Sequence, residues 1–290
     1  MQCTSHEPRL YRMLPVFLVL LMFLGGCSAR IEQFKKFGDL SSAYATAFNS
    51  YIDASFTVFM EYNSYDLVIN QSEDYNIRND NISYNDAEAR DRIVYINSLK
   101  EHIKTLNKYF QSLSVLASSD APATTAANMK DLVNKLEALG ANIGGTNAGG
   151  IAESATQIIV TGIQLAALER ELQLHGQIIS DQIHLEKQAL QDIQHQMGFY
   201  STSLQDQRMQ DSVTDRYLSP DPLPDKWASI RNEIYIQQMQ SDELNTALEA
   251  ANKLEEAFSQ LCTNKITIDY ILSLEDNANN LLSLINTISK

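Results

Sequence analysis

The amino-acid sequence predicts an all-α fold, an elongated antiparallel helical bundle of about six helices with coiled-coil character. The first observation behind this prediction is where proline occurs. After residue 26 the chain has prolines only at 122, 220, 222 and 224, all in short stretches that resemble connectors. Because proline interrupts helical hydrogen bonding, its exclusion from the long segments favours long helices.

The second observation is apolar periodicity. Apolar residues recur at steps of three and four over 96–113 and 271–288, and with skipped positions over 168–197. The three series are Ile96, Leu99, Ile103, Leu106, Phe110 and Leu113; Ile271, Leu274, Ala278, Leu281, Ile285 and Ile288; and Leu168, Leu172, Ile179, Ile183, Leu190, Ile193 and Met197. Such spacing places one apolar seam along a helix. A seam of this kind can close within one chain or between chains.

Six helices are therefore expected, over residues 31–70, 86–118, 125–140, 151–208, 225–262 and 267–289. The second helix follows residues 85–88, which match a capping box, an Asx side chain with glutamate three residues later. The Asn- and Asp-rich stretch before it is expected to be a solvated loop or a frayed end. Breaks are expected at 120–122 and at 219–225, the segment that holds three prolines.

The first predicted helix is rich in aromatic residues. These are Phe34, Phe37, Tyr44, Phe48, Tyr51, Phe56, Phe59, Tyr62 and Tyr65. At helical spacing, an aromatic stripe usually lies in a core. These rings spread around more than one face, however, so Tyr51, Tyr62 and Tyr65 are candidates for contact with a partner protein.

The amino terminus has the three parts of a secretory signal. Arg9 and Arg12 outweigh Glu7 in a weakly positive leader, and residues 13–24 read MLPVFLVLLMFL, without a charged or hydrogen-bonding side chain. Continued through Gly26, the apolar run has fourteen residues. As a helix it would reach roughly 21 Å, short of a hydrocarbon core of about 30 Å. The sequence therefore predicts a removable signal rather than a membrane span.

This signal ends in Leu24, Gly25, Gly26 and Cys27. The series resembles the lipobox of bacterial lipoproteins, in which an aliphatic residue and two small ones precede a cysteine. The resemblance implies cleavage before Cys27, a diacylglycerol on its thiol and an acyl chain on the freed amine. In such lipoproteins a serine in second position, here Ser28, permits sorting to an outer membrane. An envelope protein on that membrane, facing the periplasm or the cell surface, is expected; an ordinary signal with a chance cysteine is the alternative.

These features divide the chain into residues 1–26, a removed signal, 27–30, a lipidated tether, and 31–290, an extended bundle with an optional subdivision near 219–225. The leader carries a net charge of +1 and the whole chain −14, so the mature body carries −15. Such an acidic body has no electrostatic attraction to nucleic acid and is repelled by anionic head groups. Its membrane attachment must come from the acyl chains.

Cysteine and histidine indicate neither a metal site nor a catalytic site. Once Cys27 carries lipid, Cys262 is the one cysteine left in the mature chain, and it is expected to be a small core residue. His175 lies nearly opposite His184 and His195 on one predicted helix, and the latter two are about 16 Å apart. Because a helical zinc pair needs i,i+4 spacing, we expect surface histidines, no metal and no cofactor beyond the lipid.

The expected function is that of a non-enzymatic envelope lipoprotein, a helical scaffold that binds an envelope protein partner or forms a homo-oligomer. The alternative is a pore-forming or surface-exposed effector in which residues 141–168 insert into a bilayer. Glu153 and Gln157 interrupt that apolar run and count against a span. An enzyme ranks third, because the sequence has no serine elbow, phosphate loop or Cys/His nucleophile pattern.

Overall fold

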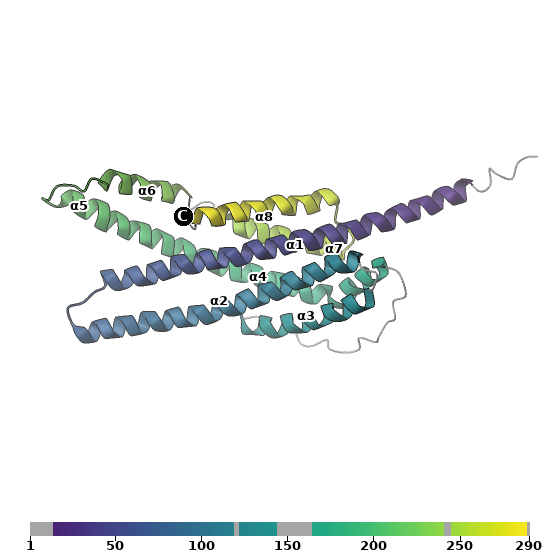
Figure 1. The fold of residues 1–290 in the computed structure, drawn as a ribbon, viewed down its shortest axis with the longest axis horizontal. Coiled ribbons are helices and arrows are strands. Elements are labelled where there is room, and N and C mark those ends of the chain that lie inside the picture. Colours follow the sequence, from purple (N-terminus) through teal and green to yellow (C-terminus); the bar gives the residue numbers. More distant parts are fainter. Residues whose placement is uncertain (1–13, 119–121, 144–163, 241–244, 289–290) are drawn as a thin grey trace, which may run out of the picture.

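The computed structural model describes residues 14–118, 122–143, 164–240 and 245–288, and all of the elements in these ranges are helical (Figure 1). The predicted all-α class is therefore confirmed. The elements are α1 (Leu14–Ile69), α2 (Tyr75–Ser118), α3 (Pro122–Asn142), α4 (Gln164–Met209), the π-helical turn η2 (Gln210–Thr214), α5 (Asp215–Leu218), α6 (Trp227–Gln240), α7 (Asn245–Cys262) and α8 (Ile268–Ile288).

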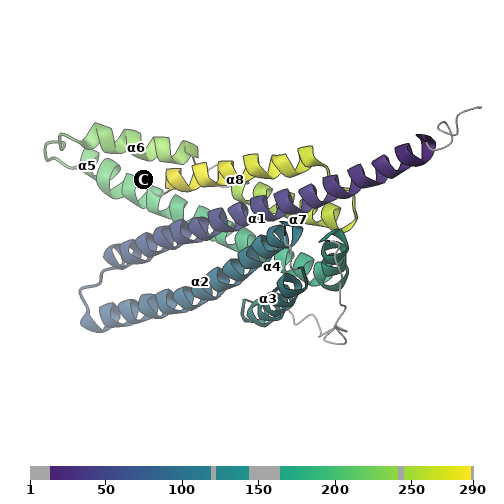
Figure 2. The ribbon, with the colours of Figure 1, turned by 45° about the vertical axis from the view of Figure 1, so that its right-hand side comes forward.

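The helices pack along one long axis, so the molecule is an elongated bundle. α1 and α2 run antiparallel, α4 packs against both, and α3 packs against α2 and α4. α7 and α8 form a shorter pair on α4 and α1. The α1–α2 turn and α5 lie at the end opposite to the start of α1 (Figure 2). We name residues 61–91 and 199–236 the distal end, and residues 28–37 and 261–268 the proximal end.

The predicted apolar seams form the core. Every residue of the series in 96–113 and of the series in 168–197 is buried. In the carboxyl-terminal series Ile271, Leu274, Ala278 and Leu281 are buried as well. These seams close within one chain, because α1 covers them with a row of aromatic residues. Phe37 shows the packing: its ring centroid lies 5.8 Å from those of Phe110 and Phe258.

Gly38 brings the backbones of α1 and α2 into contact. A Cβ atom at this position would lie 2.6 Å from the carbonyl oxygen of Phe110 and 2.9 Å from the backbone nitrogen of Ser114. The Ser114 hydroxyl, one helical turn along, donates a hydrogen bond of 2.6 Å to Asp39. The absence of a side chain at Gly38 thus sets the spacing of α1 and α2.

The start of α2 differs from the prediction. The helix begins at Tyr75, not near residue 86, and most of the predicted solvated loop is helical. Its first turn is capped by Asp74, whose carboxylate accepts a hydrogen bond of 2.7 Å from the backbone N–H of Asn76. The predicted cap, Asn85, is instead buried within the helix and accepts a 2.8 Å hydrogen bond from the Asn63 side chain of α1. Asn85 therefore makes a contact between α1 and α2 and does not cap the start of a helix.

Two further predicted boundaries also differ. The first helix starts at Leu14, so α1 runs without interruption through the lipobox and the predicted tether 27–30. The fifth is described as two helices, α6 and α7, on either side of residues 241–244. α6 folds back along α4 and η2, so the predicted break at 219–225 is the turn of a second hairpin.

Candidate functional site

The distal end carries most of the exposed apolar surface. Eighteen large apolar side chains are exposed among the described residues, and twelve of them lie at this end. Those on α1 and α2 are Val68, Ile69, Tyr75, Ile77, Ile82 and Tyr84, and those on the second hairpin are Phe199, Tyr217, Leu218, Leu223, Tyr235 and Ile236. Because large exposed apolar surface marks protein or membrane interaction sites, the end where these side chains gather is the candidate functional surface.

The first turns of α2 form a helical segment without a core beneath it. From Tyr75 to Tyr84 every side chain except Asn81 is exposed, and both tyrosines are 71% exposed. The segment consists mainly of Asn, Asp, Ser, Tyr and Ile, which are mediocre helix formers. Short helices of such residues are marginal in water unless they pack against something. The rest of α2 continues this segment, whose apolar side chains stay exposed.

An aromatic cluster joins the two distal hairpins. Tyr62 lies between Phe199 and Tyr200, with ring centroids 5.8 and 4.8 Å away, and Phe59 also contacts Tyr200, at 5.5 Å. Further out, the Tyr65 hydroxyl donates a hydrogen bond to the Asp211 carboxylate. Burial and this bond together raise the pKa of Tyr65 to about 12. The cluster fixes the α1–α2 tip against α4.

Of the three tyrosines predicted to contact a partner, the structure places two at the distal end. Both are half-buried: Tyr62 lies in the aromatic cluster, and Tyr65 is bonded to Asp211 beside it. Tyr51 does not fit the interpretation, because it is fully buried in the α1 core. Burial raises the pKa of its hydroxyl far above the ordinary value. Two strongly exposed residues, Tyr75 and Tyr84, were missed because their segment was interpreted as a loop.

The α1–α2 tip, residues 61–91, is strongly acidic. It holds eight acidic and two basic side chains, a net charge of −6. The acidic residues alternate with the exposed apolar ones, so that Asp74, Asp80 and Asp86 flank Tyr75, Ile77 and Ile82 along the chain. Charge of one sign around apolar side chains favours a partner of the opposite sign and disfavours a second copy of the same surface.

A second feature, a polar cluster in the core, was not predicted from the sequence. His102 of α2 is fully buried, and its Nε2 lies 2.8 Å from the Gln182 side-chain oxygen of α4. Its Nδ1 lies 3.3 Å from the buried Glu186 carboxylate, but neither carboxylate oxygen has hydrogen-bond geometry. Burial and the charge of Glu186 raise the pKa of Tyr44 of α1, and Gly140 of α3 lies against Gln182. Four helices therefore meet at this cluster.

Glu186 should make the stability of the bundle depend on pH. Burial raises the pKa of this carboxyl group, and His102 opposes the shift. The folded chain then holds the proton more tightly than the unfolded chain, so stability is fullest in acid and falls as pH rises through the raised pKa. Glu186→Gln, which stays neutral, should gain about 1 kcal/mol in unfolding free energy near pH 7 and little near pH 4.

Denaturant titrations at several pH values measure this difference. Glu275→Gln on α8, where the glutamate is exposed, is the matched control and should follow the wild-type profile. A Glu186→Gln protein with a wild-type pH profile would show that the buried carboxyl group does not destabilise the fold.

The histidines singled out in the sequence are dispersed. His195 and His184 are exposed, and His184 and Lys187 both contact the Glu255 carboxylate of α7. His175 is half-buried and lies 2.9 Å from Glu171. Among the described residues, no group of three or more His, Cys, Asp or Glu side chains is arranged to hold a metal ion.

Cys262 is not the core residue that the sequence predicted. It is exposed at the end of α7, where the turn to α8 begins, although Gly176 lies against its sulfur. Partial desolvation raises the pKa of the thiol to about 11, and Arg30 opposes this shift. A thiol with a raised pKa is a poor nucleophile near neutral pH.

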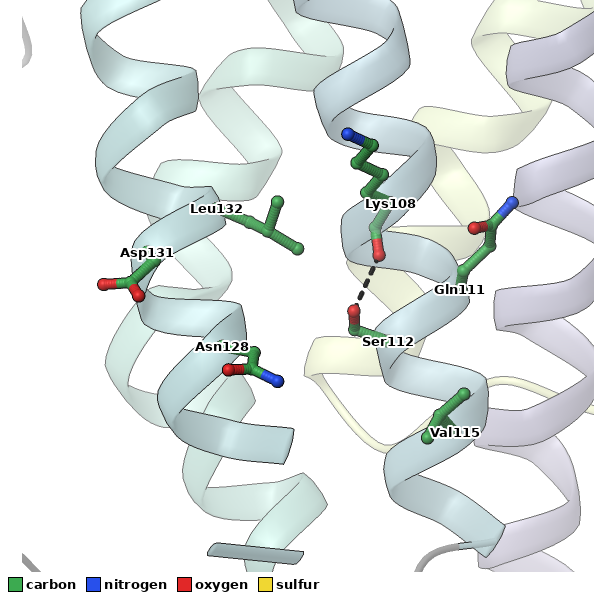
Figure 3. A pocket seen from close by; sticks show the side chains of 7 residues that line it. All are labelled: Lys108, Gln111, Ser112, Val115, Asn128, Asp131 and Leu132. Atoms are coloured by element: carbon green, nitrogen blue, oxygen red, sulfur yellow. Dashed lines mark hydrogen bonds between the residues drawn. The ribbon is translucent and has the colours of Figure 1, made fainter. Parts of the chain in front are cut away.

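A shallow groove runs between α2 and α3 (Figure 3), with a volume of about 480 Å³. It is lined by Lys108, Gln111, Ser112 and Val115 of α2 and by Asn128, Asp131 and Leu132 of α3. The Ser112 hydroxyl is engaged, since it donates a 2.8 Å hydrogen bond to the Lys108 carbonyl. The groove is a mixed surface whose side chains do not converge on one point as a catalytic set would.

Several predicted features fall outside the described part of the chain. The side chains of the lipobox residues Leu24, Gly25, Gly26 and Cys27 are not described, whereas Ser28 is described and exposed. Residues 144–163, most of the segment 141–168 that the alternative function would insert into a bilayer, also lie outside it. Across the helices that are described, none has an apolar stretch of the length needed to cross a bilayer. Comparison with family models, curated proteins and solved structures finds no match to this chain.

Proposed function

We propose that this chain is a non-enzymatic envelope lipoprotein, anchored through acyl chains on Cys27, that binds a partner protein with its distal end. The observation that carries this proposal is the helical segment 75–84, which exposes four large apolar side chains and has no core beneath it. Cys27 is the fourteenth residue of α1, whereas this segment follows the turn beyond the other end of that helix, Ile69 (Figure 1). A scaffold that reaches from a membrane to a partner needs this arrangement.

The charge of the α1–α2 tip indicates the surface chemistry of the partner protein. A net charge of −6 around apolar side chains calls for a protein surface that is basic and carries apolar residues. The same charge makes a dimer through two tips unfavourable. The described part of each helical seam is buried within the single chain, so the seams give this proposal no support for an oligomer.

Photocrosslinking in cells tests the proposal. A photoreactive amino acid in place of Tyr84 should give one crosslinked adduct, which Ile77→Ser should abolish. Both residues are exposed, so the unfolding free energy should change by no more than about 0.5 kcal/mol. Replacing Asp80 and Asp86 by asparagine should weaken the adduct, because charge attraction is removed while the apolar contact remains.

Leu174 provides the matched control, since it is an exposed apolar residue of α4 outside the distal end. The photoreactive residue at 174 should not give the same adduct, and Leu174→Ser should leave crosslinking from position 84 intact. Identical adducts from both positions would contradict a distal binding surface. An adduct with twice the mass of this chain would replace the basic partner with a homo-oligomer.

A further inference from the structure

We propose that the proximal end of the bundle contacts anionic lipid head groups directly. The lipid anchor would then hold the long axis of the body away from the membrane surface, whereas a flexible tether would leave its orientation free. This inference rests on the proposed lipidation of Cys27 and adds a second membrane contact, made by the folded body itself. Three observations support it: the shortness of the tether, the position of the α7–α8 turn, and the charge of the two ends.

The ordered body begins three residues after the predicted lipid. Arg30 is buried, its guanidinium donates a 2.6 Å hydrogen bond to the Leu261 carbonyl, and it lies 4.6 Å from the Phe34 ring centroid. Only Ser28 and Ala29 separate it from Cys27. Even fully extended, this tether spans about 11 Å at most, and α1 is helical throughout it. The acyl chains therefore hold the first turn of the folded body close to the bilayer.

The α7–α8 turn shares this end of the molecule. The Gln33 side chain donates a 2.9 Å hydrogen bond to the Ile266 carbonyl, so the turn is attached to the first turns of α1. Asn264 closes the turn in the left-handed conformation, with φ of 57°. Residues 262–265 are all exposed. When the acyl chains on Cys27 are in a bilayer, the α7–α8 turn therefore lies next to the bilayer surface.

The charge of the two ends favours one orientation. The proximal segments 28–37 and 261–268 contain four basic side chains and one acidic side chain, a net charge of +3. Of the basic residues, Lys35 and Lys265 are exposed, whereas Lys36 pairs with Glu32 at 3.6 Å. Arg30 is buried and interacts with Glu169 of α4, so the positive charge that a membrane can meet comes from Lys35 and Lys265. The α1–α2 tip carries −6. An anionic surface therefore attracts the proximal end and repels the distal end.

This orientation sets the height of the partner surface. α1 is continuous from the predicted lipid site to Ile69. At 1.5 Å per residue it places the distal turn roughly 63 Å from Cys27. A body that stands on its proximal end would present the α1–α2 tip near that height, whereas a flexible tether would allow the tip to fall back to the membrane.

Fluorescence quenching on the lipidated full-length protein tests the inference. The protein is reconstituted into vesicles of phosphatidylcholine and phosphatidylglycerol that contain a lipid with a nitroxide on its head group. In a Cys262→Ser background, a fluorophore is attached at Thr263→Cys in the α7–α8 turn or at Ser72→Cys at the distal turn. The label at 263 should lose most of its fluorescence, and the label at 72 should keep nearly all of it.

A linker variant separates an upright body from a tethered one. A twelve-residue Gly/Ser insertion between Ser28 and Ala29, with a reach of roughly 20 Å, should relieve the quenching at 263 in vesicles of phosphatidylcholine alone. Equal quenching at both labels, or quenching at neither, overturns the inference while vesicle flotation still reports the anchor. If the mass of the N-terminal peptide shows no acyl chains, the proposed function fails together with this inference.

Discussion

Cys27→Ser should abolish acylation and leave the uncut precursor in the membrane fraction. A serine hydroxyl is far less acidic than a thiol, so it offers no comparable nucleophile for the transfer of diacylglycerol. Without the lipid, the acidic mature body has no strong attraction to a membrane, and the uncleaved apolar leader is then its only attachment. Palmitate labelling and the mass of the N-terminal peptide measure both effects, which should be complete rather than partial.

Cys262→Ser is the control for this experiment, because it removes the other cysteine of the mature chain. Cys262 lies on the exposed end of α7, and its thiol has a raised pKa. Palmitate labelling should therefore be unchanged in this variant. Normal labelling of the Cys27→Ser protein would remove the basis for the lipoprotein assignment and for the orientation derived from it.

Gly38→Ala should produce the largest loss of stability among single substitutions to a slightly larger residue. The new methyl group would meet backbone atoms of Phe110 and Ser114, which can yield only if α1 and α2 separate. Overpacking of this kind should lower the unfolding free energy by about 3 kcal/mol, because no flexible side chain can move aside. The better helix propensity of alanine would recover up to about 1 kcal/mol. Chemical denaturation of the soluble body measures the net change.

Gly198→Ala is the matched control within α4. A Cβ atom there would have no atom of another residue within 4 Å, apart from its own helix and chain neighbours. Alanine should therefore stabilise the fold by up to about 1 kcal/mol, through helix propensity alone. If both glycine variants changed stability equally, the close approach of α1 and α2 would not be a determinant of the fold.

Apolar periodicity predicted the core well, because burial in a helical bundle follows from one repeating local pattern. The series from Ile96 to Leu113 is buried along its whole length, as the spacing implied. Helix boundaries were harder to predict where a contact between distant segments decides the outcome. Asn85 has the local pattern of a cap, but its side chain is bound by Asn63, which is 22 residues away and on another helix.

The polar residues of the core could not be predicted from the local sequence either, because contacts between distant segments bring them together. His102 directly precedes the seam residue Ile103, and nothing in the local pattern indicates which helix will cover it. Only the packing of α4 brings Gln182 and Glu186 to its ring. The distal surface was missed for a related reason. Residues 75–84 lack an apolar seam because they have no core to face, so a helical segment had the composition of a loop.

The bond between Arg30 and Leu261 has a consequence for when the chain can fold. The two residues are 231 positions apart, and α1 packs against α8, near the other end of the sequence. The first helix therefore cannot complete its packing until almost the entire chain is present. Contacts of such long sequence separation slow folding, because a large loop must close before they form. The fold of this chain would therefore remain largely open until almost all of the chain is available to fold.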